Sequence, residues 1–179
     1  MIQMSEETTI EIPEEFDAEY EDGVFTLSKG EEVSKKMEHA LVDVEIDGQE
    51  AIFSTPSTKK DVQSIVHTFR SHVENMIEGL QDEHVYRMKG VYAHFPMTIK
   101  EQNNQVVIEN FMGERNPRKV DIMEGVTVEV DGEDLTLKGA NKDAVSQTAA
   151  RVEQMCHKGN RDPRTFQDGV YITSGGDQE

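Results

Sequence analysis

Six basic residues fall in two short stretches of the second half of this 179-residue chain. The first basic loop contains Arg115, Arg118 and Lys119. The second basic loop contains Lys158, Arg161 and Arg164. Both stretches contain Gly, Asn and Pro, which are typical of loops. Arginine predominates, and its planar guanidinium binds phosphate oxygens through paired hydrogen bonds. Cations on such loops favour phosphate and sugar contacts to folded RNA, in which shape rather than sequence is read.

The charge of the whole chain opposes that interpretation. Its 36 acidic and 18 basic residues give a formal net charge of −18. The excess is uneven: residues 1–90 hold 21 acids and 8 bases, and residues 91–179 hold 15 and 10. A salt-rich cytoplasm would suit such a chain, because the Debye length at ~1 M salt is about 3 Å. RNA binding would then depend on short-range contacts from the few bases present.

Two other interpretations of the basic loops stay open at this stage. Exposed Lys and Arg are by default solvated, so the loops could carry ordinary surface charge. The chain could also be an acidic tandem adaptor that binds protein partners through exposed sheet edges and has no RNA role. Saturable binding to RNA would separate an RNA-binding protein from such an adaptor.

No pattern of catalytic or metal-binding residues occurs. His67 and His72 are five residues apart, whereas two ligands on one helix face need a spacing of four. Cys156 and His157 have no further Cys or His nearby. Nucleophile-elbow, phosphate-loop and dinucleotide-binding motifs are all missing from the sequence. We therefore expect neither an enzyme nor a bound metal or cofactor.

Two helices are predicted around these loops. The first is capped by Ser57 or Thr58, has a plausible end at Gly79, and spaces its apolar residues by three and four. Those apolar residues are Val62, Ile65, Val66, Phe69, Val73, Met76, Ile77 and Leu80. The second covers about 142–157, is capped by Asn141, and leads directly into the second basic loop. Alternating apolar segments separated by Asp-Gly turns predict strands elsewhere.

The pattern of the first half restarts in the second half. Matching pairs occur in the same order: Gly30-Glu31 with Gly113-Glu114, Val44–Gly48 with Val128–Gly132, Lys60-Asp61 with Lys142-Asp143, and Gly90–Tyr92 with Gly169–Tyr171. This is an internal duplication with a period of about 80 residues. We predict an α+β protein, a tandem duplication of a small antiparallel sheet with one helix packed on it and a closing strand after the helix. The repeats span 8–84 and 85–173, and 1–7 and 174–179 are flexible tails.

The cellular location follows from what the chain lacks. Cys156 is the only cysteine, so no internal disulfide can form, which suits a reducing compartment. No stretch approaches the roughly 20 apolar residues that span a bilayer, and the N-terminal residues do not resemble a signal peptide. We expect a cytoplasmic protein without a membrane partner.

Four segments carry a resemblance to a known family. They are Arg164–Ile172, Tyr92–Pro96, Ile108–Glu114 and Phe69–Met76. Together they resemble the archaeal and eukaryotic branch of the family of the sixth protein of the large ribosomal subunit, in register from about residue 8 to 173. The acidic balance is similar to that of members from halophilic archaea.

The resemblance implies a tandem α+β fold, a structural role in the ribosome and no catalysis. It implies binding to large-subunit ribosomal RNA, mainly through the second repeat, near the sarcin–ricin loop and the factor-binding stalk base. Neighbouring ribosomal proteins are the implied protein partners, with translation GTPases close to the stalk. Besides the six basic residues, the expected RNA-binding residues are Tyr92, His94 and Gly113.

Overall fold

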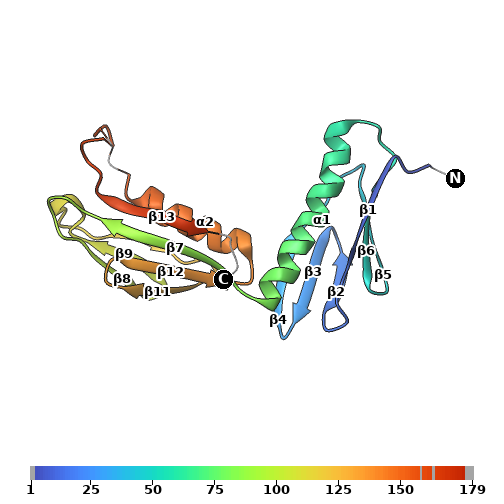
Figure 1. Cartoon of the computed structure of the whole chain (residues 1–179), viewed down its shortest axis with the longest axis horizontal. Coiled ribbons are helices and arrows are strands. Elements are labelled where there is room, and N and C mark those ends of the chain that lie inside the picture. Colours follow the sequence, from blue (N-terminus) through green and yellow to red (C-terminus); the bar gives the residue numbers. More distant parts are fainter. Residues whose placement is uncertain (1–2, 158, 163, 176–179) are drawn as a thin grey trace. The chain divides into compact units, whose positions relative to one another are not determined.

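The computed structural model describes residues 3–157, 159–162 and 164–175. The chain divides into two compact units, Met1–Gln81 (unit 1) and Asp82–Glu179 (unit 2). Within the described ranges each unit contains two antiparallel sheets and one α-helix (Figure 1). The predicted duplicated α+β fold is confirmed, with one correction: each copy has two small sheets rather than one.

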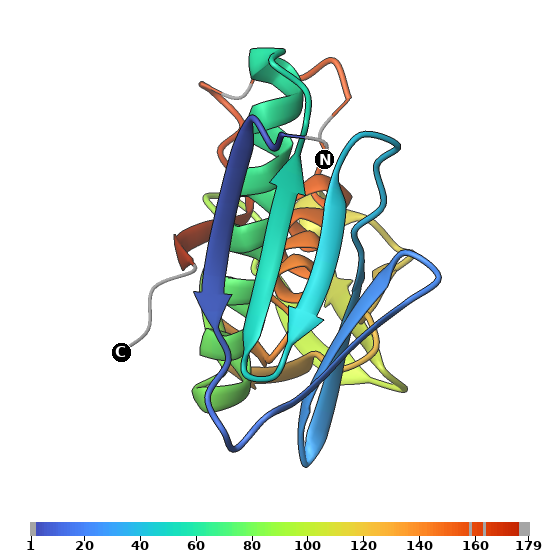
Figure 2. The ribbon, with the colours of Figure 1, turned by 90° about the vertical axis from the view of Figure 1, so that its right-hand side faces the viewer.

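Unit 1 folds its strands into two three-stranded sheets. Its elements are β1 (Glu6–Glu11), β2 (Asp17–Glu21), β3 (Val24–Lys29), β4 (Glu31–Lys36), β5 (Asp43–Asp47), β6 (Glu50–Thr55) and α1 (Lys60–Gln81). The sheet orders are β1-β6-β5 and β2-β3-β4. Helix α1 packs on β1 and β6 and also contacts β3 and β4. Figure 2 looks onto the first of these sheets, with α1 behind it.

The apolar spacing of α1 produces the buried face that it predicts. Val62, Val66, Phe69, Val73, Met76 and Ile77 are buried. Ile65 and Leu80, at the margins of the same stripe, are half-buried. The helix continues through Gly79 to Gln81. Gly79 is itself buried in the helix, so its role as the helix end was a wrong prediction.

Unit 2 repeats this order of elements and adds a strand. Its elements are β7 (His84–Val91), β8 (Thr98–Gln102), β9 (Gln105–Glu109), the 3₁₀ turn η1 (Phe111–Gly113), β10 (Arg118–Asp121), β11 (Thr127–Asp131), β12 (Asp134–Gly139), α2 (Lys142–Met155) and β13 (Gly169–Gly175). The sheet orders are β11-β12-β7-β13 and β10-β9-β8. Helix α2 contacts both sheets: it contacts β7, β12 and β13 of the four-stranded sheet and β10 of the three-stranded sheet.

The expected closing strand after the helix does not occur among the described residues of the first copy. Strand β7 pairs with β12 along one edge and with β13 along the other, and both partners belong to unit 2. It therefore opens the second copy, in the position that β1 holds beside β6 in the first. Strand β7 ends at Val91.

The core of unit 2 connects its helix, its two sheets and one loop. Buried side chains from β9, β12 and α2 form a single cluster that also includes Cys156 and Phe111. Asn141 caps α2 as predicted, accepting hydrogen bonds from the Asp143 and Ala144 backbone N–H groups. Because Phe111 is only 1% exposed, the chain that follows β9 is anchored in the core.

Among the described residues, neither helix is long and apolar enough to cross a membrane.

Candidate nucleic-acid interface

The first basic loop occupies a place where the first copy has a single turn residue. In unit 1, β3 and β4 pair up to Lys29 and Glu31, across Gly30 alone. In unit 2 the ladder between β9 and β10 ends at the pair Ile108 and Arg118. Residues 110–117 therefore form an irregular loop at this end of unit 2.

Hydrogen bonds and left-handed backbone conformations fix the start of this loop. Asn110 (φ 58°), Met112 (φ 50°) and Gly113 (φ 77°) all have positive φ. The Asn110 side-chain amide donates to the backbone oxygen of Pro96 over 2.8 Å. A Cβ atom at Gly113 would lie 3.2 Å from the Phe95 ring, so glycine serves both the conformation and the close approach.

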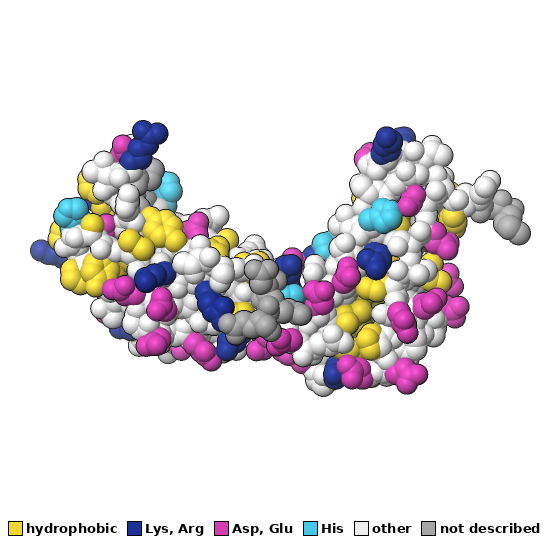
Figure 3. All heavy atoms as spheres, viewed as in Figure 1, with side chains coloured by type: hydrophobic (Ala, Val, Ile, Leu, Met, Phe, Trp, Pro, Cys, Tyr) yellow, Lys and Arg dark blue, Asp and Glu magenta, His cyan; other side chains and the backbone are white. Residues whose placement is uncertain are grey.

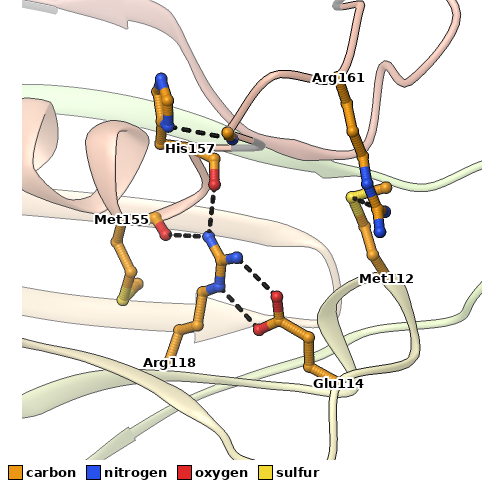
Figure 4. Close-up of polar contacts among 7 residues, drawn as sticks. Met112, Glu114, Arg118, Met155, His157 and Arg161 are labelled. Carbon is orange, nitrogen blue, oxygen red and sulfur yellow. Dashed lines mark hydrogen bonds and ion pairs between the residues drawn. The ribbon is translucent and has the colours of Figure 1, made fainter.

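Arg118 joins the first basic loop to the chain that follows α2 (Figure 4). Its Nε and Nη2 atoms donate to the two carboxylate oxygens of Glu114, at 2.9 and 2.7 Å. Its Nη1 atom donates to the backbone oxygens of Met155 (2.6 Å) and His157 (2.9 Å). The guanidinium also lies 4.4 Å from the centre of the Phe111 ring. Arg118, predicted as an RNA contact, is thus turned toward groups of its own chain.

The electrostatics of the pair agree with this geometry. The hydrogen bonds from Arg118 lower the pKa of the Glu114 carboxyl, and the charges of Arg118 and Arg161 act in the same direction. The hydrogen bonds to Glu114 likewise raise the pKa of Arg118. Both groups are therefore held in their charged forms.

The second basic loop reaches the first through Arg161. Its Nη1 atom contacts the Met112 sulfur at 3.5 Å, as Figure 4 shows, and its guanidinium lies 5.5 Å from the centre of the Phe166 ring. A turn shapes the loop, because the backbone N–H groups of Thr165 and Phe166 donate to the Asp162 backbone oxygen. Arg161 and Arg164 are exposed. Lys158, also predicted to bind RNA, lies outside the described residues.

A third segment, residues 92–96, packs against both loops. The backbone N–H of Ala93 donates to the carboxylate of Asp168, which is only 3% exposed. Phe95 lies over Gly113 and is 46% exposed. The carboxylate of Glu133 accepts the Tyr92 hydroxyl hydrogen bond and so raises the pKa of Tyr92.

These contacts bring the three segments to one end of unit 2. We call residues 92–96, 110–118, 159–162 and 164–168 the basic tip. It includes the predicted residues Tyr92, His94, Gly113, Arg115, Arg118, Arg161 and Arg164. Figure 3 shows Lys, Arg and His side chains beside hydrophobic ones at this end of unit 2.

Lys119 is placed differently from its neighbours in sequence. It is exposed and lies directly opposite Val107 in the pair of β10 and β9. Successive strand residues point to opposite faces, so Lys119 is on the other face of β10 from Arg118. It therefore flanks the basic tip and is not part of it.

Comparison with known proteins identifies the family. The family model described as Ribosomal protein L6 matches residues 95–169. The large ribosomal subunit protein uL6 of Haloarcula marismortui is 40% identical over 92% of this chain and 93% of the relative. The uL6 proteins of Methanococcus vannielii and Natronomonas pharaonis are each 38% identical, over 91% and 93% of this chain and 90% and 94% of the relatives. The chain belongs to the ribosomal protein L6 family.

Membership in the L6 family defines the general role of the chain. It is a structural constituent of the large ribosomal subunit and not an enzyme, and it is located on the cytoplasmic ribosome. Its assembly partners are ribosomal RNA and other ribosomal proteins. The relatives include proteins from halophilic archaea.

Three residues that organise the tip of this L6 protein were not expected from the sequence. Glu114 and Phe95 were noted only as members of matched segments. Asp168, with Gly169, was interpreted as a turn, but it is a buried acceptor just before β13. Phe95 and Asp168 have partners that are distant in the sequence. Glu114 is only four residues before Arg118, but in an irregular loop that spacing predicts no contact.

The Glu114–Arg118 pair makes stability depend on pH in a defined direction. We expect Glu114→Gln to lower the melting temperature at pH 7 by no more than about 4 °C, since a partly exposed ion pair contributes at most about 1 kcal/mol. Folding lowers the pKa of Glu114. The contribution of its charge to the free energy of unfolding is therefore complete above the pKa of the unfolded chain, about 4.3. That contribution is lost as the pH falls through the lower pKa of the folded chain. Melting curves of both proteins between pH 7 and pH 3 should converge on acidification; a gap that persists at pH 3 would contradict this.

Proposed function

We propose that this L6-family protein binds large-subunit ribosomal RNA through the basic tip, so that the second repeat, residues 85–173, is its main RNA-binding unit. The principal phosphate contacts come from Arg115, Arg161 and Arg164, with Lys119 on the flank. Arginine in irregular loops suits the phosphate and sugar contacts by which folded RNA is recognised. The observation that carries the proposal is that internal bonds hold three separate segments together and leave these arginines exposed.

Tyr92, His94 and Phe95 complete the proposed surface. All three are exposed, and Phe95 lies over Gly113 in the loop that carries Arg115. Aromatic faces next to cations are suited to the unstacked bases and sugar edges that proteins contact in folded RNA. The proposed location is near the sarcin–ricin loop and the base of the factor-binding stalk, with translation GTPases as neighbours. The resemblance of the four matched segments implies this location.

Unit 1 has a different role in this proposal. Most of the acidic excess lies in residues 1–90, and acidic side chains are prominent on the face of unit 1 in Figure 3. RNA phosphates would be repelled by such a surface. We therefore assign unit 1 to contacts with solvent, neighbouring proteins or bound factors.

Filter binding at graded salt tests the proposed function. The full chain is titrated against a large-subunit rRNA fragment that contains the sarcin–ricin region, from 50 mM to 1 M KCl. We expect saturable binding. The logarithm of the association constant should fall linearly with the logarithm of the salt concentration, with a slope of about −0.9 for each phosphate contacted. An rRNA fragment of equal length from another region is the control, and circular dichroism at each salt concentration checks that the acidic chain stays folded. Absence of saturable binding by the folded chain, as for a protein-binding adaptor, would refute the proposal.

A further inference from the structure

The side chain of Arg118 has little capacity left for an external ligand. A guanidinium has five N–H donors, and four of them are engaged by Glu114 and the two backbone oxygens. One face of the guanidinium lies over Phe111, and the side chain is only 24% exposed. Arg118 therefore differs from the exposed arginines of the same tip in what it can contact.

The groups that Arg118 contacts belong to different parts of unit 2. Glu114 is in the first basic loop, and Met155 and His157 are at the C-terminal end of α2, where the second basic loop begins. A positive charge is favourable there because the last backbone carbonyls of a helix carry partial negative charge. The guanidinium thus spans the gap between the two loops that carry the proposed phosphate contacts.

We propose that Glu114 and Arg118 are a positioning pair, which holds the 110–117 loop against the end of α2 and so preforms the rRNA-binding surface without contacting RNA. This rests on the proposed function of the tip. A preformed surface binds more tightly than one whose loops become ordered on binding, because the entropy cost of ordering is already met in the free protein. Glu114 then strengthens RNA binding although its own charge repels phosphate.

Glu114→Gln separates positioning from simple charge effects, because the two predict opposite signs. Removal of a carboxylate beside three arginines should tighten RNA binding if charge alone matters. If Glu114 positions the loops, we expect binding to weaken, by about five- to tenfold, because glutamine keeps one acceptor oxygen but loses the negative charge and the second acceptor for Arg118. The matched control is Glu124→Gln, the same charge change on an exposed residue beyond the other end of β10. Unchanged or tighter binding by Glu114→Gln would overturn the proposal.

Arg118→Lys adds a test at constant net charge. A lysine keeps the positive charge but cannot donate to Glu114 and the two carbonyls in one plane. We expect weaker binding with an unchanged salt slope, since no phosphate contact is removed. Arg115→Gln is the reference for a direct contact, and it should reduce the slope by about 0.9. Arg118→Gln is compared with that reference, because a lysine at this position could still neutralise a phosphate. A loss of slope of about 0.9 in Arg118→Gln would make Arg118 a phosphate ligand and overturn the positioning role.

Amide hydrogen exchange in the free protein distinguishes failure of this inference from failure of the proposed function. Glu114→Gln should accelerate exchange in residues 110–117 and leave the strands of unit 2 protected. Suppose that Glu114→Gln accelerates exchange in the loop but the unmodified chain does not bind RNA. The proposed function would then be refuted, and the structural role of the pair would stand. Exchange that does not change would refute the positioning pair itself.

Discussion

Reversing the charge of Arg115 and Arg164 together is expected to weaken rRNA binding at least about 100-fold near 50 mM salt. Each arginine is proposed to make a charge-assisted contact, which contributes about 1.5–3 kcal/mol, and each introduced carboxylate also repels phosphate. Both side chains are exposed, and neither guanidinium forms a hydrogen bond or ion pair with another residue of the described ranges. The fold should therefore persist, with an unchanged circular dichroism spectrum and melting temperature.

The matched control for this variant lies in unit 1. Lys59→Glu with Lys60→Glu makes the same change of net charge at two exposed positions at the start of α1. If the basic tip is the contact surface, this control reduces affinity only through the weak, salt-screened effect of total charge. Equal losses in the two double variants would show that total charge, rather than the tip, governs binding.

The second large effect is expected in the core of unit 2. Leu137 on β12 is fully buried and belongs to the cluster that joins β9, β12 and α2. Leu137→Ala should destabilise unit 2 by about 2–5 kcal/mol, from lost burial and the cavity that remains. Because that cluster also anchors Phe111 under the first basic loop, rRNA binding should fall at temperatures where unit 2 begins to unfold. Thermal denaturation and filter binding at matched temperatures measure both effects.

Leu27→Ala in unit 1 is the counterpart of this substitution. Leu27 on β3 is also fully buried, so the chemical change and the expected loss of stability are similar. If residues 8–84 and 85–173 are separate repeats and the second binds RNA, Leu27→Ala should leave affinity nearly unchanged while unit 2 remains folded. Equal loss of binding in both variants would argue against a separate RNA-binding unit.

The sequence alone determined the features that depend on neighbouring residues. The spacing by three and four in α1, the Asn141 cap of α2 and the Asp-Gly turns at 22–23, 47–48 and 131–132 each report local backbone geometry. The duplication was visible because the two copies keep the same local signals in the same order. The family resemblance depended on short segments of the same kind.

Only the tertiary structure decided which strands pair and where the charged side chains point. Strand β7 directly follows α1 in sequence, yet it pairs with β12 and β13 in the other unit. Arg118 and Lys119 are adjacent and equally basic, but one is bound within the chain and the other is exposed on the opposite face of β10. Arg118 donates a hydrogen bond to Met155, 37 residues away in the sequence, and Ala93 donates one to Asp168, 75 residues away. Periodicity is a property of a short segment, whereas the partner of a strand edge, a guanidinium or a buried carboxylate is selected by the packing of the whole unit.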